Sequence, residues 1–187
     1  MSDSEASGPV QNETAGNPAI EPFLTHLRSF DGVLELAPGP GSEFPEIAWG
    51  DHFFYYAPDG EVPANTQPFT TVVTKNYPDD ALSELDGPDR WRLNIHVGQA
   101  RSAELTGSGS PSSGSTSSGS TSSDSTEPDS TDFAESDRLL RHPVYGALGW
   151  VCVVNPGERT TRTVLDLAGQ AFADARRRAE RRSGTTA

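Results

Sequence analysis

The sequence predicts an α+β domain, in which a single antiparallel sheet of about five or six strands carries an N-terminal helix and a longer C-terminal helix on one side. Three observations support this fold class. Apolar residues recur at helical spacing near both ends of the chain. Short strand-like runs lie between these two regions. Gly, Pro, Asp or Asn bounds each run, which is the residue chemistry of turns.

The first helix is expected to begin at Asn17 and Pro18, because a capping side chain followed by proline is typical of a helix start. Asp31-Gly32 is expected to end it. Between these points the apolar residues follow helical spacing: Ile20, Phe23, Leu24, Leu27 and Phe30.

Five strand-like runs follow the first helix, at 33–36, 46–49, 51–57, 68–75 and 90–97. After them, 100–105 is predicted to be a short helix, 137–141 helical or irregular, and 150–155 a buried strand.

The longest helix is predicted to start at Thr160 or Thr161. Its last turns are rich in arginine, which suits the negative end of a helix dipole. Its apolar stripe consists of Val164, Leu165, Leu167, Ala168, Ala171, Phe172 and Ala175.

Two segments lack any apolar periodicity and are expected to be disordered: an acidic tail at 1–17 and a Ser/Gly/Thr-rich insert at 106–131. The domain organisation predicted from the sequence is therefore a single domain over 18–182, interrupted by the insert, with a disordered end at 183–187.

The charge composition predicts a host with a salty cytoplasm. The net charge is −13, and of the 14 basic residues only Lys75 is a lysine. A carboxylate-rich surface repels itself in dilute buffer, and salt screens that repulsion, since the Debye length falls to about 3 Å at 1 M. An ordinary acidic protein is the alternative.

The halophilic interpretation predicts that stability rises with salt. The unfolding midpoint, followed by the fluorescence of Trp49, Trp91 and Trp150, should be higher in molar potassium chloride than in dilute buffer, because screening weakens the self-repulsion of the folded state. A midpoint that is unchanged or lower in salt would contradict this interpretation.

No targeting or membrane segment is expected, so the predicted location is cytoplasmic. The single cysteine, Cys152, lies in the apolar run WVCVV and is expected to be a core residue. The four histidines have no metal-ligand spacing, so we expect no metal and no cofactor.

No motif of a known catalytic class occurs in the sequence: there is no nucleophile elbow, Walker loop, dinucleotide fingerprint or zinc-protease helix. Nucleic acid is also not expected as a partner, because residues 1–175 carry 9 basic and 26 acidic residues, a net charge of −17. The oligomeric state is left open.

One strand has a polar, cation-rich face. In RWRLNIHV, alternation directs Trp91, Leu93, Ile95 and Val97 to one side, and Arg90, Arg92, Asn94 and His96 to the other. On the preceding strand Phe69, Thr71, Val73 and Lys75 are expected to share a face. Donors of this kind suit a small anionic ligand, although they also pair with carboxylates. The candidate ligand-binding residues are Lys75, Arg92, Asn94, His96, His142 and Tyr145.

Four runs resemble a bacterial and archaeal family catalogued only as a domain of unknown function: PEIAWGDHFFYYAPDG (45–60), TQPFTTVVTKNYPDD (66–80), RLNIHVG (92–98) and HPVYGALGWVCVVNPGERT (142–160). The resemblance covers most of residues 20–182 and implies a fold but no reaction. The V-T-K strand, the late aromatic-plus-valine strand and the terminal helix are also similar to the MmcQ/YjbR-like double-wing proteins, a group often labelled DNA-binding. This resemblance implies a nucleic-acid-associated protein as a lesser alternative function.

Two functions from different classes follow. The first is a non-catalytic module that binds a ligand or partner, with aromatic residues of the strands (Trp49, Phe53, Phe54, Tyr55, Tyr56) lining an apolar pocket. The second is a small enzyme that acts on an anionic metabolite at the Lys75, Arg92 and Asn94 face, with His142 or Tyr145 as acid or base. The absence of a catalytic signature favours the first.

Overall fold

A computed structural model describes residues 17–107 and 131–183. Along the chain the elements are α1 (Glu21–Arg28), β1 (Val33–Leu36), η1 (Glu46–Ala48), β2 (His52–Tyr56), β3 (Thr70–Val73), β4 (Arg92–His96), α2 (Gln99–Thr106), β5 (Leu140–Arg141), η2 (Gly146–Leu148), β6 (Trp150–Val154) and α3 (Thr161–Ser183). The segments predicted to be disordered fall outside the described residues except at their junctions, where α2 extends through Thr106 and α3 through Ser183.

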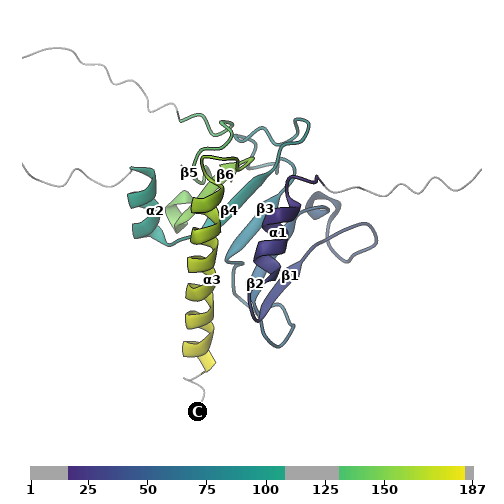
Figure 1. Ribbon diagram of the computed structural model, residues 1–187. Helices are drawn as coiled ribbons and strands as arrows, with labels where there is room; N and C mark the ends of the chain where they lie inside the picture. Colours follow the sequence, from purple (N-terminus) through teal and green to yellow (C-terminus); the bar gives the residue numbers. More distant parts are fainter. Residues whose placement is uncertain (1–16, 108–130, 184–187) are drawn as a thin grey trace, which may run out of the picture.

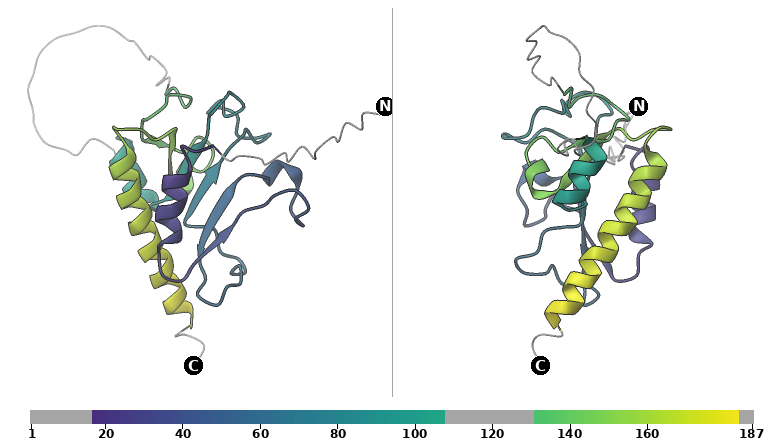
Figure 2. Two further views of the ribbon diagram at one scale, coloured as in Figure 1. Left: turned by 45° about the vertical axis from the view of Figure 1, so that its right-hand side comes forward. Right: turned by 90° about the vertical axis from the view of Figure 1, so that its left-hand side faces the viewer.

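The six strands form one sheet in the order β1-β2-β3-β4-β6-β5, and every neighbouring pair is antiparallel. Helices α1 and α3 lie on the same side of this sheet, whereas α2 lies beside its β5 end (Figures 1 and 2). The α+β fold class predicted from the sequence is confirmed.

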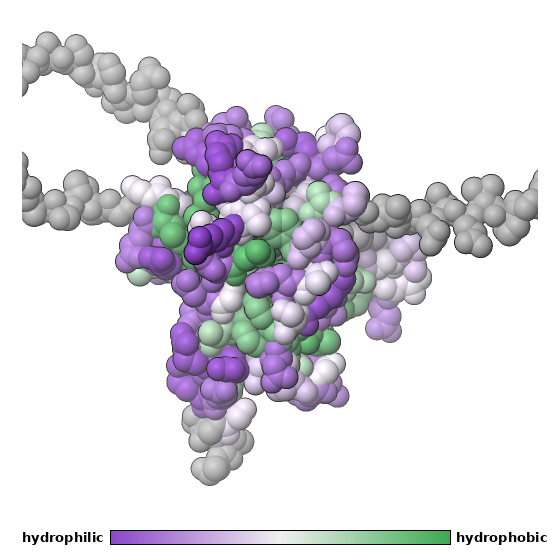
Figure 3. Space-filling view, viewed as in Figure 1, coloured by the Kyte–Doolittle hydropathy of each residue, from purple (hydrophilic) through white to green (hydrophobic). Residues whose placement is uncertain are grey.

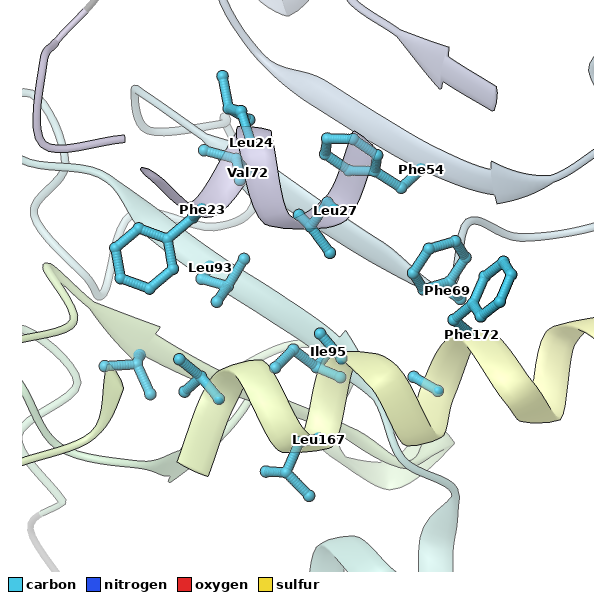
Figure 4. Close-up of a cluster of buried hydrophobic side chains, with 14 of the residues drawn as sticks. Phe23, Leu24, Leu27, Phe54, Phe69, Val72, Leu93, Ile95, Leu167 and Phe172 are labelled. Carbon is cyan, nitrogen blue, oxygen red and sulfur yellow. The ribbon is translucent and has the colours of Figure 1, made fainter. Parts of the chain in front are cut away.

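The core lies between the sheet and the two helices, and we call this side of the sheet the helix face. Alternate residues of the strands reach it because successive side chains of a strand point to opposite sides. They meet apolar side chains of α1 and α3, as Figure 4 shows. Buried members of this core include Phe23, Leu24 and Leu27 of α1, Phe54, Val72, Leu93 and Ile95 of the strands, and Leu167 and Phe172 of α3.

The residues that lead directly into helix α3 donate hydrogen bonds to a remote carboxylate. Asp137 Oδ1 accepts from the Gly157 N–H at 2.9 Å, the Thr160 N–H at 3.0 Å and the Thr160 hydroxyl at 2.6 Å. Asp137 Oδ2 accepts from the Arg159 N–H at 3.0 Å. These hydrogen bonds hold the pKa of Asp137 well below its usual range, although burial acts in the opposite direction. Asp137 thus caps α3 from about twenty residues upstream.

Two predicted elements were wrong. The run 46–49 is not a strand: Glu46–Ala48 form the 3-10 turn η1, because Pro45 precedes them and the N–H groups of Ala48 and Trp49 donate to carbonyls three residues back. Within 137–141, predicted to be helical or irregular, Leu140 and Arg141 form β5 by pairing with Cys152 and Val151. A two-residue strand is too short for any alternation to be seen in the sequence.

Phe69 does not share a face with Thr71, contrary to the alternation expected for this strand. The Phe69 N–H donates to the carbonyl of Phe54 at 2.9 Å, while Thr70 is the residue paired with Phe54. Two residues thus oppose one, which is the geometry of a β-bulge. The bulge places the Phe69 ring in the core, 5.6 Å from the ring of Phe172.

Gly149 fixes the loop that precedes β6. Its φ is +89°, and a Cβ there would lie 2.4 Å from the carbonyl carbon of Gly98. Its carbonyl accepts hydrogen bonds from the N–H groups of Val97 and Gly98, at 2.9 and 3.1 Å. Only glycine permits both this backbone conformation and this close approach. The loop over residues 142–149 is therefore held against the end of β4.

On the side carrying α1 and α3, hydrophilic residues occupy most of the outer surface, with smaller hydrophobic areas between them (Figure 3). Among the described helices, none is long and apolar enough to cross a membrane.

Candidate functional site

The side of the sheet opposite α1 and α3 contains a cavity of about 600 Å³, and we call this side the cavity face. Its floor consists of side chains of the strands. Successive side chains of a strand point to opposite sides, so the residues next to those that enter the core face the cavity. Side chains from four strands contribute: Phe53 and Tyr55, Thr71 and Val73, Arg92 and Asn94, and Trp150. The walls come from four segments between strands, at 45–48, 67–68, 77–80 and 142–145.

The structure brings four of the six candidate residues together. Arg92, Asn94, His142 and Tyr145 line the cavity. Lys75 and His96 do not belong to its lining.

Lys75 lies beyond the end of β3, where its Nζ donates to the carbonyl of Trp49 and lies 3.2 Å from Asp51 Oδ1. Asp51 is fully buried and also accepts from the Tyr77 hydroxyl at 2.5 Å. Burial and the neighbouring carboxylate raise the pKa of Tyr77 well above its usual range. This cluster anchors Tyr77 in the wall of the cavity and neutralises the charge of Lys75.

His96 ends β4, with its Nε2 3.1 Å from the carbonyl oxygen of Leu148. Its ring centroid lies 5.3 Å from that of Trp150. Burial lowers its pKa, and the charge of Arg178 acts in the same direction. His96 thus contacts the end of the 142–149 loop and the ring of Trp150.

Arg92 is only 2% exposed and forms a bidentate ion pair with Asp80. Its Nη1 lies 3.0 Å from Asp80 Oδ1, its Nη2 pairs with Oδ2, and Nη1 also donates to the Ser83 hydroxyl at 2.8 Å. A buried pair of this kind leaves little net positive charge. The cation on the floor of the cavity is therefore compensated by a carboxylate from its wall.

His142 is buried, and its Nδ1 accepts hydrogen bonds from the N–H groups of Val144 and Tyr145, at 3.2 and 3.1 Å. Nε2 lies 3.7 Å from Asp80 Oδ2 and 3.1 Å from Arg92 Nη2. His142 and Arg92 thus converge on one carboxylate.

Burial lowers the pKa of His142 to about 3, and the charge of Arg92 acts in the same direction against that of Asp80. The ring is therefore neutral at pH 7, and the lone pair that a general base would use is occupied by two backbone N–H groups. His142 is suited to holding the loop in place, not to transferring protons.

Because His142 is buried, we predict that the free energy of unfolding falls in acid. Its pKa is lower in the folded protein than the value of 6.5 expected when unfolded. Protons therefore bind the unfolded chain first, and stability falls as the pH drops below 6.5. Between pH 7 and pH 5 the wild type should lose roughly 2 kcal/mol more unfolding free energy than His142→Asn, measured in urea.

Asparagine is the matched replacement because its Oδ1 can occupy the place of Nδ1. The pKa of His96 is also lowered by burial, so a His96→Asn variant should keep the part of the acid sensitivity that belongs to His142. Equal pH slopes for wild type and His142→Asn would contradict this account.

Two buried polar atoms of cavity-lining residues have no hydrogen-bond partner among the described residues, namely Asn94 Oδ1 and Arg92 Nε. Asn94 is 3% exposed, and its Nδ2 donates to the Thr71 hydroxyl at 2.9 Å. Buried polar atoms are nearly always paired, so these two are unusual.

The sequence did not indicate Asp80, Ser83 or Trp150 as part of the site. In the sequence, Asp79 and Asp80 have only the pattern of a turn. Nothing in the neighbouring sequence indicates that Asp80 pairs with Arg92, twelve positions later. Of the five aromatic residues expected at a pocket, Phe53 and Tyr55 line the cavity, whereas Phe54 belongs to the core. Because successive side chains of a strand point to opposite sides, the sequence alone could have separated Phe53 and Tyr55 from Phe54.

A family model matches residues 19–184 of this chain, and its description is a family of unknown function, DUF6194. The chain belongs to this family. The matched span includes all six strands and every residue of the cavity, so the cavity lies within the DUF6194 domain. No curated protein and no solved structure matches the chain. In the described parts of this DUF6194 domain, no group of three or more His, Cys, Asp or Glu residues is placed to hold a metal ion.

Proposed function

We propose that this DUF6194 domain is a non-catalytic binding module whose cavity takes up a small organic molecule with a flat apolar body. The observation that carries the proposal is the composition of the cavity. Its size, about 600 Å³, falls in the range of small-molecule sites. Its lining is rich in aromatic rings: Phe53, Tyr55, Tyr77, Tyr145 and Trp150.

The surroundings of the cavity support the same function. Seven large hydrophobic side chains of the described residues are exposed, and three of them, Ile47, Val144 and Tyr145, line the cavity. They come from loops on opposite sides, 45–48 and 142–145. Exposed apolar groups that gather around a concave surface are typical of an interaction site.

The titratable groups support binding over catalysis. His142 Nδ1 is occupied by backbone N–H groups, and the Tyr77 hydroxyl donates to Asp51. Burial raises the pKa of the Cys152 thiol to about 12, so this sulfur is a poor nucleophile. Each of these groups serves the structure of the domain.

The arrangement of charge favours an uncharged ligand over an anion. Lys75 lies outside the cavity, so it does not share a binding face with Arg92 and Asn94. Asp79 and Asp80 both line the cavity, and Asp80 compensates Arg92. An anionic ligand would thus meet two carboxylates and one neutralised cation.

Two of the three tryptophans provide the test. Trp150 lines the cavity, whereas Trp91 is buried in the core on the helix face. A library of neutral aromatic fragments is added to ¹⁵N-labelled full-length protein, and the indole N–H signals are followed by NMR. Binding in the cavity should shift the Trp150 signal and leave that of Trp91 in place.

The variant Thr71→Phe places a ring on the cavity floor and should abolish the Trp150 shift. The matched control, Thr163→Phe, makes the same change at an exposed position of α3 and should bind as wild type does. The proposal is wrong if no fragment shifts Trp150 selectively, or if Thr71→Phe binds the fragments unchanged.

A further inference from the structure

The charge of the cavity lining defines a chemical class of ligand. We infer that the ligand carries a positively charged amine beside its flat apolar body, and that Asp79 in the cavity wall pairs with this amine. The inference rests on the binding function proposed above and specifies what that cavity recognises.

Asp79 is the uncompensated charge of the lining. Three of the lining residues have charged side chains: Asp79, Asp80 and Arg92. Arg92 and Asp80 form a buried bidentate pair, so their charges cancel. In the part of the chain that the structure describes, the carboxylate of Asp79 makes no hydrogen bond or ion pair. The lining therefore has one excess negative charge, and it belongs to an exposed side chain that a ligand can reach.

Asp79 lies in a β-turn that is fixed at both ends. The Asp80 N–H donates to the carbonyl of Tyr77 at 2.9 Å, which closes the turn around Asp79. The Tyr77 hydroxyl donates to the buried Asp51, and the Asp80 carboxylate is held by Arg92. A carboxylate on a turn anchored in this way requires little further ordering when a ligand binds.

The aromatic residues of the cavity favour the same class of ligand. The π electrons of aromatic rings attract cations, and Trp and Tyr do so most strongly. Besides Phe53, the rings that line the cavity are those of Trp150, Tyr55, Tyr77 and Tyr145. Among the lining residues described, Arg92 is the one lysine or arginine, and Asp80 already compensates it. An ammonium group would thus meet one free carboxylate and several aromatic rings, without an opposing cation.

Three ligands of similar size separate the charge classes: benzylamine, an ammonium ion at pH 7, benzyl alcohol, which is uncharged, and benzoate, an anion. Each is titrated into the full-length protein at pH 7 and one fixed salt concentration while the Trp150 indole signal is followed by NMR. Benzylamine should bind about tenfold more tightly than benzyl alcohol, because it adds an ion pair and cation–π attraction to the same ring. Benzoate should bind most weakly.

The variant Asp79→Asn removes the charge and keeps the size of the side chain. Because Asp79 is exposed, the variant should fold as the wild type does, and its preference for benzylamine over benzyl alcohol should fall to about threefold or less.

Asp59→Asn is the matched control, since the chain as a whole is acidic and attracts any cation. Asp59 also follows a proline in an exposed turn, which the Gly60 N–H closes on the carbonyl of Ala57, but it lies outside the cavity lining. The variant changes the net charge by the same amount and should retain the tenfold preference.

Binding of benzylamine that is no tighter than that of benzyl alcohol or benzoate overturns the inference and leaves the binding module in place. A preference that stays above threefold in Asp79→Asn also overturns it, as does an equal loss of preference in Asp59→Asn. If neither these compounds nor any neutral fragment shifts Trp150, the binding function itself is wrong.

Discussion

Replacing Arg92 with alanine should cost roughly 3–5 kcal/mol of unfolding free energy, because it removes one partner of a buried ion pair. The Asp80 carboxylate, about one-tenth exposed, would keep its charge without a counterion, and the Ser83 hydroxyl would lose its contact. Urea unfolding of the variant at pH 7 measures the change. Leu93→Ala, which opens a cavity in the core beside it, should cost a similar amount, roughly 2–5 kcal/mol.

The double variant Arg92→Met with Asp80→Leu is the control for this prediction. Replacement of both members of a buried pair by apolar residues of similar size is often nearly neutral, so most of the lost stability should return. A cost below about 1 kcal/mol for Arg92→Ala alone would show that the ion pair contributes little to folding.

Replacing Asp137 with alanine should cost roughly 2–4 kcal/mol, because the turn that leads into α3 loses the acceptor of its N–H groups. The N–H groups of Gly157, Arg159 and Thr160 all donate to this one carboxylate. The loss should appear both in the unfolding midpoint and in faster amide exchange of the first turn of α3.

Asp132→Ala is the matched control, since it makes the same change in the same segment. Asp132 is exposed and, among the described residues, accepts a hydrogen bond from the nearby Ala134 N–H alone, so its loss should cost less than about 0.5 kcal/mol. Similar costs for the two variants would contradict the capping role of Asp137.

Most of the fold could be predicted because its strands are bounded by turn residues and its two packed helices carry clear apolar stripes. What could not be predicted depends on pairing between distant residues. β5 exists because Leu140 and Arg141 lie against β6, and the bulge at Phe69 is defined by its partner Phe54. Neither feature has a local signature in the chain.

The candidate site shows the same division. Alternation correctly placed Arg92 and Asn94 on the side of β4 away from the core. It failed for Lys75, because β3 ends at Val73 and the chain then turns toward Asp51. It also gave no indication of Asp80, whose contact with Arg92 is made across a loop. Which carboxylates pair with Lys75 and Arg92 could therefore be learned only from the structure.

The position of Cys152 has a consequence for how folded molecules react with thiol reagents. It is the one cysteine in the sequence, it is 2% exposed, and its backbone lies between Asn94 of β4 and Leu140 of β5. The sulfur lies 3.9 Å from the carbonyl oxygen of Arg141 in β5, so separation of β5 from β6 is expected to uncover it. Because β5 contributes only two residues to the sheet, its separation from β6 should require less free energy than global unfolding. The labelling rate of the native protein therefore measures the local stability of this edge strand.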